Sequence, residues 1–228
     1  MTAFQLKLIA LITMVIDHVG VFFFPQILLF RIIGRLAMPL FAWLIANGAH
    51  HTKDIYSYMR RLLVFAVISE VPFVLANRQR DPAFDTINIL FSFTLGLGAI
   101  MLLNKTRHTF MRLAIILASV AAAYMLKTDY GPTAVLMVVI SYVYYKDLPK
   151  MIMLHTLLIV SVYTLPILIQ LSGNPHQAVD GVRLFQPLCL LSLLAIAFYN
   201  KKEGIKTGYY LYFFYPLHLL IIYLLKLL

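Results

Sequence analysis

The chain has 228 residues, of which 62% are hydrophobic and only 12% carry a charge. Soluble domains are about half apolar and about a quarter charged, so this composition excludes an ordinary soluble protein. It indicates an all-α integral membrane protein, because a helix bonds its own backbone polar groups within lipid. About nine helices of roughly 20 residues would use most of the chain and leave no room for a separate soluble catalytic domain.

Nine apolar windows predict the membrane spans of a polytopic helix bundle, with eight to ten spans as the range that the sequence allows. In chain order the windows are 6–24, 27–49, 60–76, 87–104, 110–126, 132–145, 150–171, 183–199 and 207–228. Breaker pairs such as Phe24-Pro25 and Gly131-Pro132 separate neighbouring windows. No internal repeat or linker is visible, so we expect a single transmembrane domain over residues 1–228.

The net charge of +10 would suggest a nucleic-acid partner in a soluble protein. In a membrane protein the same excess follows from the enrichment of Lys and Arg in cytoplasmic loops. With the N-terminus placed in the cytoplasm, twelve Lys and Arg residues fall in inner segments and five in outer ones. We therefore expect a multi-pass protein with a cytoplasmic N-terminus, which contacts membrane lipid and no nucleic acid.

A small set of ionisable side chains lies inside the predicted spans, where a charge is costly and indicates a partner or a function. The set is Asp17, His18, Arg31, Arg35, Glu70 and His218. At a rise of about 1.5 Å per residue, all of them except Arg31 fall near the middle of the bilayer. Arg31 and Arg35 are four residues apart and therefore share one helix face. The similar depths predict a shared polar cavity.

Each of these residues also has a purely structural interpretation. Asp17 would form a buried ion pair with either arginine, and His18 would be a packed, hydrogen-bonded histidine. Glu70 would bond backbone donors freed at a helix break near the proline that follows it. No histidine pair has the spacing His-Glu-x-x-His, and Cys189 is the only cysteine, so we expect no metal site.

The segments that contain these polar residues form a recognisable set. The first two are Asp17-His18-Val19-Gly20 and Arg31-Ile32-Ile33-Gly34-Arg35-Leu36-Ala37-Met38-Pro39-Leu40-Phe41. The others are His51-Thr52, Arg61-Leu62-Leu63, Ile68-Ser69-Glu70-Val71-Pro72-Phe73, Phe93-Thr94-Leu95-Gly96-Leu97, Asp129-Tyr130-Gly131 and Phe214-Tyr215-Pro216-Leu217-His218. Together they cover most of the first hundred residues and the last span. In these segments the chain resembles the TraX family of integral-membrane acetylases.

The resemblance implies acetyl transfer from cytoplasmic acetyl-CoA to an amine or hydroxyl acceptor, by an enzyme of the bacterial cytoplasmic membrane. By distant similarity to other transmembrane acyltransferases, His18 would be the general base. Arg31 and Arg35 would then support an oxyanion or the phosphates of the donor. Asp17 or Glu70 would orient these groups. A covalent acetyl-histidine is the alternative to direct transfer.

Three residues near the inner surface complete the expected donor site. Arg60 and Arg61 would attract the phosphates of CoA, although the positive-inside rule explains the same two residues. His51, at the end of the second span, would either lie at the membrane interface or contact a ligand.

The sequence leaves the acceptor open among a pilin N-terminus, an envelope glycan, a lipid and a small molecule. The sequence also leaves open a function of another class. In this alternative the protein is a proton-coupled transporter or a lipid flippase, in which Asp17, His18 and Glu70 relay protons.

Overall fold

The structure, a computed structural model, describes residues 1–173 and 184–228. Within these two ranges every regular element is a helix, which confirms the all-α prediction. The chain divides into two compact units, each built from two separate stretches. Unit 1 contains Met1–Phe41 and Tyr144–Gly204, and unit 2 contains Ala42–Val143 and Ile205–Leu228.

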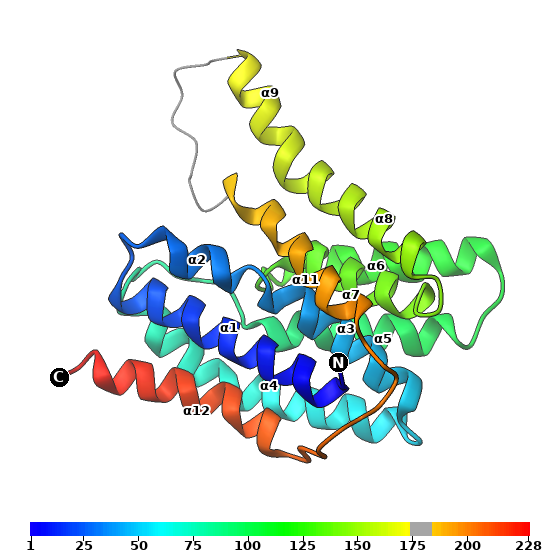
Figure 1. Cartoon of the computed structure of the whole chain (residues 1–228), viewed down its shortest axis with the longest axis horizontal. Coiled ribbons are helices and arrows are strands. Elements are labelled where there is room, and N and C mark those ends of the chain that lie inside the picture. The colour runs from blue at the N-terminus through cyan, green and yellow to red at the C-terminus, as the bar shows by residue number, and fades with distance from the viewer. Residues whose placement is uncertain (174–183) are drawn as a thin grey trace. The chain divides into compact units, whose positions relative to one another are not determined.

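Unit 1 combines the first two helices of the chain with helices from its last third (Figure 1). Its elements are α1 (Ala3–Phe23), α2 (Leu28–Gly34), α8 (Leu148–Ile159), the π-helical turn η1 (Val160–Thr164), α9 (Leu165–Gly173), the 3-10 helix η2 (Gln186–Leu191) and α11 (Ser192–Ala197). α8, η1 and α9 follow one another without a break, so the π-helical turn lies inside one long helical run. Helix α3 (Ala37–His51) begins in unit 1 and continues into unit 2.

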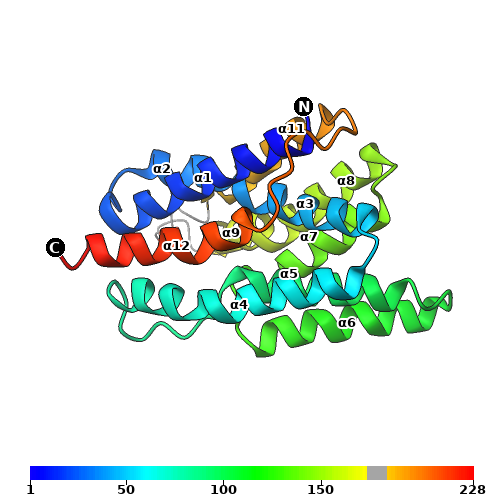
Figure 2. The same cartoon turned by 90° about the horizontal axis from the view of Figure 1, so that it is seen from below.

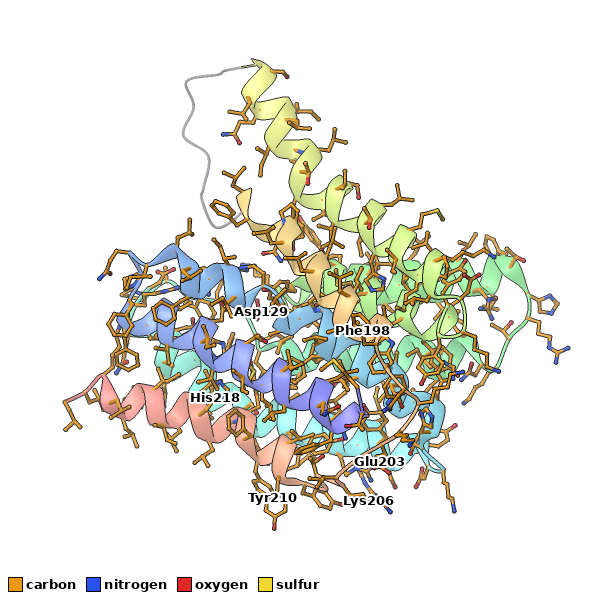
Figure 3. All side chains as sticks on the ribbon, in the orientation of Figure 1. Asp129, Phe198, Glu203, Lys206, Tyr210 and His218 are labelled. Atoms are coloured by element: carbon orange, nitrogen blue, oxygen red, sulfur yellow. The ribbon has the colours of Figure 1, made fainter. Side chains whose placement is uncertain are left out.

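The start of α1 is held by the segment that follows α11. The backbone N–H of Phe4 donates to the carbonyl oxygen of Glu203 (2.9 Å). The backbone N–H of Ala3 donates to the carbonyl oxygen of Lys202 at the same distance. The terminal amine bonds the carbonyl oxygen of Phe198, and Figure 3 labels Phe198 and Glu203 in this segment. The two stretches of unit 1 are therefore joined through their backbones.

Helices α1 and α2 lie side by side because two glycines allow a close approach (Figures 1 and 2). A Cβ added at Gly20 of α1 would lie 2.3 Å from Cβ of Phe30 in α2. A Cβ added at Gly34 of α2 would lie 2.1 Å from Oδ1 of Asp17 in α1. Real Cβ atoms do not approach other atoms so closely, so neither position has room for a larger residue.

Unit 2 contains a helix of 24 residues, α4 (Ile55–Arg78), and the C-terminal helix, α12 (Tyr210–Leu225). Its other elements, besides most of α3, are α5 (Ile89–Leu103), α6 (Thr109–Met125) and α7 (Gly131–Val143). α12 lies along α4, as Figure 2 shows. Phe65 of α4 packs between Tyr212 and Phe213 of α12, with ring centroids 5.2 and 4.9 Å away. α5 packs closely on α7, where a Cβ at Gly96 would lie 2.8 Å from Cβ of Val138.

The predicted spans coincide with helical segments throughout the described residues, although several boundaries differ. α4 begins at Ile55, five residues before the predicted start at 60, because Asp54 caps it by accepting from the Ser57 N–H (2.9 Å). The second span is interrupted at Arg35, between α2 and α3. The first residue predicted for the eighth span, Arg183, lies outside the described residues.

Length and apolarity together single out three helical runs of the described chain as long enough to cross a membrane. They are Ala3–Phe23, Leu28–His51 and Leu148–Gly173. Five further apolar helices among the described residues have 10 to 17 residues. The chain is therefore a helical protein with membrane-spanning features, and the number of crossings stays a prediction.

Candidate functional site

An ion pair between α1 and α2 forms the centre of the candidate site in unit 1. Nη1 of Arg31 lies 2.7 Å from Oδ2 of Asp17, and Nη2 of Arg35 lies 3.9 Å from Oδ1 of the same carboxylate. The side chains of Asp17, Arg31 and Arg35 are 16, 19 and 6% exposed. A charged group that is removed from water needs such a partner, so the carboxylate and the two guanidinium groups stabilise one another.

The local sequence explains this geometry. Arg31 lies in the last turn of α2, where a cation is favoured by the helix dipole. Arg35 is the C-cap residue with helical backbone angles, so it stays on the same face as Arg31. Gly34 contributes only backbone at the point of contact, and this leaves space for the carboxylate of Asp17. The distances show the ion pair between Asp17 and the arginines that the structural interpretation of these residues predicts.

Arg35 makes further contacts that fix its guanidinium group. Its Nε donates to the carbonyl oxygen of Arg31 (3.2 Å), and its Nη1 donates to Oε1 of Gln186 (2.8 Å). Gln186 comes from η2 and is 4% exposed. Gln186 is not among the residues predicted from the sequence, because that set contains only ionisable groups within the spans. A neutral amide in an otherwise apolar run was the available signal, since a buried amide also needs a partner.

His18 lies next to the ion pair in the chain and points in a different direction from Asp17, because consecutive helical residues are turned by about 100°. The positive charge of Arg31 acts on its imidazole. Its ring also packs near that of Phe22, with centroids 6.3 Å apart. Unit 1 therefore brings together His18, Asp17 and the two arginines of the predicted set.

Glu70 belongs to unit 2, where it binds the start of α5. Its Oε2 accepts from the backbone N–H of Asn88 (3.0 Å) and from the Asn88 side-chain amide (2.6 Å). The same amide donates to the carbonyl oxygen of Ala66 (2.8 Å), and Oδ1 of Asn88 caps α5 by accepting from Leu90. The helix break predicted near Glu70 is not present: α4 continues through Pro72. Glu70 instead meets donors at the beginning of another helix.

His218 lies within α12 of unit 2, as Figure 3 shows. Its Nδ1 is 2.9 Å from the carbonyl oxygen of Phe214, and its ring stacks on that of Phe214 at 5.4 Å. Only 7% of the residue is exposed. These contacts are those of a packed histidine. The cavity that would join Glu70 and His218 to the residues of unit 1 stays a prediction.

The three residues expected near the inner surface all belong to unit 2. Nδ1 of His51 is 2.8 Å from the carbonyl oxygen of Asn47. Arg61 lies over the Tyr58 ring, with 6.0 Å between its Cζ and the ring centroid, and it bonds the hydroxyl of Tyr212. Arg60 is exposed.

Comparison with known proteins covers nearly the whole chain. The family described as TraX protein matches residues 3–226. A Dichelobacter nodosus protein named "Probable fimbrial assembly protein FimC, serogroup H1" is 30% identical over 233 residues, which is 96% of this chain and 93% of that protein. Protein TraX of Escherichia coli is 29% identical over 143 residues, or 62% of this chain and 55% of its own length. An uncharacterized protein of Rickettsia prowazekii is 34% identical over 91 residues, or 40% and 33% of the two chains.

No solved structure matches the chain. The family match extends over both units, so it includes the ion pair of unit 1 and the carboxylate of Glu70 in unit 2. The chain belongs to the TraX family.

Proposed function

We propose that this protein is a membrane-embedded acetyltransferase that moves an acetyl group from cytoplasmic acetyl-CoA to an amine or hydroxyl of the cell envelope. The observation that carries the proposal is the position of His18 beside the paired charges of Asp17 and Arg31. Membership of the TraX family supports it, and so does a relative whose name refers to fimbrial assembly. A subunit of a surface fibre is accordingly our first choice of acceptor.

The proposed reaction needs a base, and we assign this role to the imidazole of His18, which lies beside the ion pair of unit 1. When bound, acetyl-CoA supplies an activated acetyl thioester. The acceptor nitrogen or oxygen forms a bond to the acetyl carbon, and the bond from that carbon to sulfur breaks. His18 takes the proton that the acceptor loses and returns it to the leaving thiolate.

The two arginines have different parts in this proposal. Arg35 is nearly buried and is held by protein groups, so it serves to keep the site in shape. Arg31 is the more exposed of the two, and its charge is available for an oxyanion or for an anionic part of the donor. Asp17 keeps both guanidinium groups in place. For the CoA phosphates we propose Arg60, which is exposed, rather than Arg61, whose guanidinium already contacts Tyr58 and Tyr212.

We place the protein in the bacterial cytoplasmic membrane with its N-terminus inside. The count of basic residues in the predicted loops supports this orientation. A donor made in the cytoplasm and an acceptor on the other side would then meet at membrane depth.

Label transfer in proteoliposomes tests the proposal. The full-length protein, radiolabelled acetyl-CoA and envelope material from a deletion strain are combined, and protein-dependent incorporation of label is measured. We expect incorporation with the wild type and none with His18→Ala. His108→Ala is the control, because His108 is exposed before α6 and its side chain makes no capping bond.

Two results would overturn the proposal. Failure of the wild type to transfer label to any envelope fraction would remove the acetyltransferase function. Transfer by a folded His18→Ala variant at the wild-type rate would remove the assignment of the base. Mass spectrometry of the same envelope material, with a search for a missing acetyl group in the deletion strain, identifies the acceptor.

A further inference from the structure

The side-chain amide of Gln186 is fixed in one orientation by Arg35. A guanidinium group has only donors, so the atom of Gln186 that lies 2.8 Å from Nη1 of Arg35 is the amide oxygen. The amide nitrogen is therefore on the other side of the side-chain carbon and faces away from that guanidinium. It carries two N–H donors.

The two N–H donors of Gln186 belong to a residue that is shielded from water, where a hydrogen bond is stronger than at the surface. Gln186 is 4% exposed, and its neighbour Arg35 is 5% exposed, so both groups are largely shielded from water. A buried amide N–H contributes little unless it finds an acceptor, and it binds an acceptor well when one arrives. The amide therefore suits a partner that brings an oxygen and no proton.

Arg35 itself is less suited to contact a substrate directly. Its Nε and Nη1 donate to the Arg31 carbonyl oxygen and to Gln186, and its Nη2 lies 3.9 Å from Oδ1 of Asp17, beyond hydrogen-bond distance. Two of its three nitrogens are therefore already used by hydrogen bonds to the protein. Its effect on a bound molecule would pass through Gln186, because the hydrogen bond from Arg35 draws electron density toward the amide oxygen and makes the amide N–H groups better donors.

We propose that Gln186 donates a hydrogen bond to the carbonyl oxygen of the acyl group that is transferred, with Arg35 as its positioning residue. The inference rests on the acetyltransferase function proposed above and deepens it by naming the donor that recognises the acyl carbonyl. This oxygen gains negative charge while the acceptor bonds to the acetyl carbon and the carbon–sulfur bond weakens. Gln186 stabilises that charge and moves no proton.

Gln186→Glu separates the donor role from simple structural support. The carboxylate keeps an oxygen for Arg35, so the contact between η2 and the C-cap of α2 is retained. It removes both N–H donors and places a negative charge near the acyl oxygen. We expect a folded protein in which label transfer falls by about a hundredfold or more. Gln5→Glu is the matched control, because Gln5 is exposed and accepts from Thr2 in a capping box that a glutamate also forms.

A second measurement needs no turnover. The wild type should bind acetyl-CoA more tightly than CoA, by about threefold to tenfold, because only the acetylated molecule offers a carbonyl oxygen. Gln186→Glu should lose this preference, and so should Gln186→Met, which keeps the volume and introduces no charge. The melting temperature in the same detergent shows whether each variant is folded.

The outcomes distinguish the inference from the function on which it rests. Without label transfer and without a preference for acetyl-CoA in the wild type, the proposed function fails and the inference fails with it. If the wild type transfers label and both Gln186 variants keep its rate and its preference, only the inference is overturned. A loss of preference in either folded variant, with Gln5→Glu unchanged, supports it.

Discussion

The carboxylate of Asp17 occupies the space in which a side chain on Gly34 would begin. Its Oδ1 lies 2.1 Å from the position of a Cβ on Gly34, and its Cγ lies 2.3 Å from it. At this point of the contact between α1 and α2, the close approach depends on the absence of a side chain at Gly34. Because Asp17 also holds Arg31 and Arg35, that absence determines the geometry of the whole charged group.

Gly34→Ala should disturb this group. The added methyl would push the carboxylate away from both arginines, and we expect a loss of about 1–3 kcal/mol in stability together with most of the transfer activity. Gly173→Ala is the control, because Gly173 also ends a helix and a Cβ added there would have no atom within 4 Å. Thermal unfolding and label transfer are measured for both. Equal behaviour of the two variants would contradict the close contact at Gly34.

Lysine substitutions should affect the two arginines unequally. Arg35→Lys loses the planar group that reaches Asp17, Gln186 and the Arg31 carbonyl oxygen, and one ammonium cannot replace those directions. Arg31→Lys keeps a charge for the close contact with Asp17. We expect Arg35→Lys to lower kcat at least about tenfold more than Arg31→Lys. The opposite order would mean that Arg35 has no special role.

Asn88 should be important for stability rather than for turnover. Its side chain joins the Glu70 carboxylate, the Ala66 carbonyl oxygen and the first turn of α5, and none of its surface is exposed. Asn88→Ala should cost about 1–3 kcal/mol because it leaves buried groups without partners. Asn104→Ala, at the exposed C-terminal end of the same helix, should cost less. The melting temperatures of the two variants test this prediction. A similar loss of stability in both would contradict the importance of the buried cap at Asn88.

The ion pair between Asp85 and Lys127, in two loops of unit 2, should depend on pH. Lys127 donates a hydrogen bond to the carboxylate of Asp85. This hydrogen bond and the positive charge of Lys127 lower the pKa of Asp85 from 3.8. The same hydrogen bond and the negative charge of Asp85 raise the pKa of Lys127 from 10.5. The contribution of Asp85 is present above its unfolded pKa and is lost as the pH falls through its folded value. The contribution of Lys127 is present below its unfolded pKa and is lost as the pH rises through its folded value. The ion pair is therefore strongest between the two pKa values.

Hydrogen exchange checks this dependence at a nearby backbone contact. The N–H of Ile87 donates to the carbonyl oxygen of Lys127 (3.2 Å), and the N–H of Asp129 donates to that of Ile87 (2.8 Å). After correction for intrinsic rates, protection of these two amides should fall below about pH 4 in the wild type. In Asp85→Asn it should be lower at neutral pH and insensitive to acid. High salt should weaken the effect, because both side chains are exposed.

The sequence alone predicts the part of the site that follows from the cost of a charge in lipid. Asp17, Arg31 and Arg35 are conspicuous within apolar helices, and the four-residue spacing of the arginines gives them a common face. An ion pair between Asp17 and either arginine is the structural interpretation of these two facts, beside the functional one. The helical class follows in the same way from composition, because helices satisfy their own backbone groups.

Other features depend on contacts between distant parts of the chain. Gln186 is neutral and 151 residues away from Arg35, so neither its charge nor its spacing indicated the hydrogen bond between them. The partner of Glu70 is also a neutral amide, Asn88, which precedes another helix. Hydropathy cannot predict such pairs, because it measures how apolar a segment is and not what its polar residues face. The π-helical turn at Val160–Thr164 is hidden for the same reason, since its residues are as apolar as their neighbours.

The division of unit 1 between the two ends of the chain has a consequence for biogenesis. Its first stretch, which ends at Phe41, leaves the ribosome long before the second stretch, from Tyr144 to Gly204. The second stretch supplies Gln186 and the carbonyl oxygens that accept from the backbone N–H groups of Ala3 and Phe4. During this interval Arg35 lacks one of its acceptors. A chain interrupted by a stop codon after the first helices of unit 2 would contain α1 and α2 and still have an incomplete site. The hydrogen bond from Arg35 to Gln186 can therefore form only late in the synthesis of the protein.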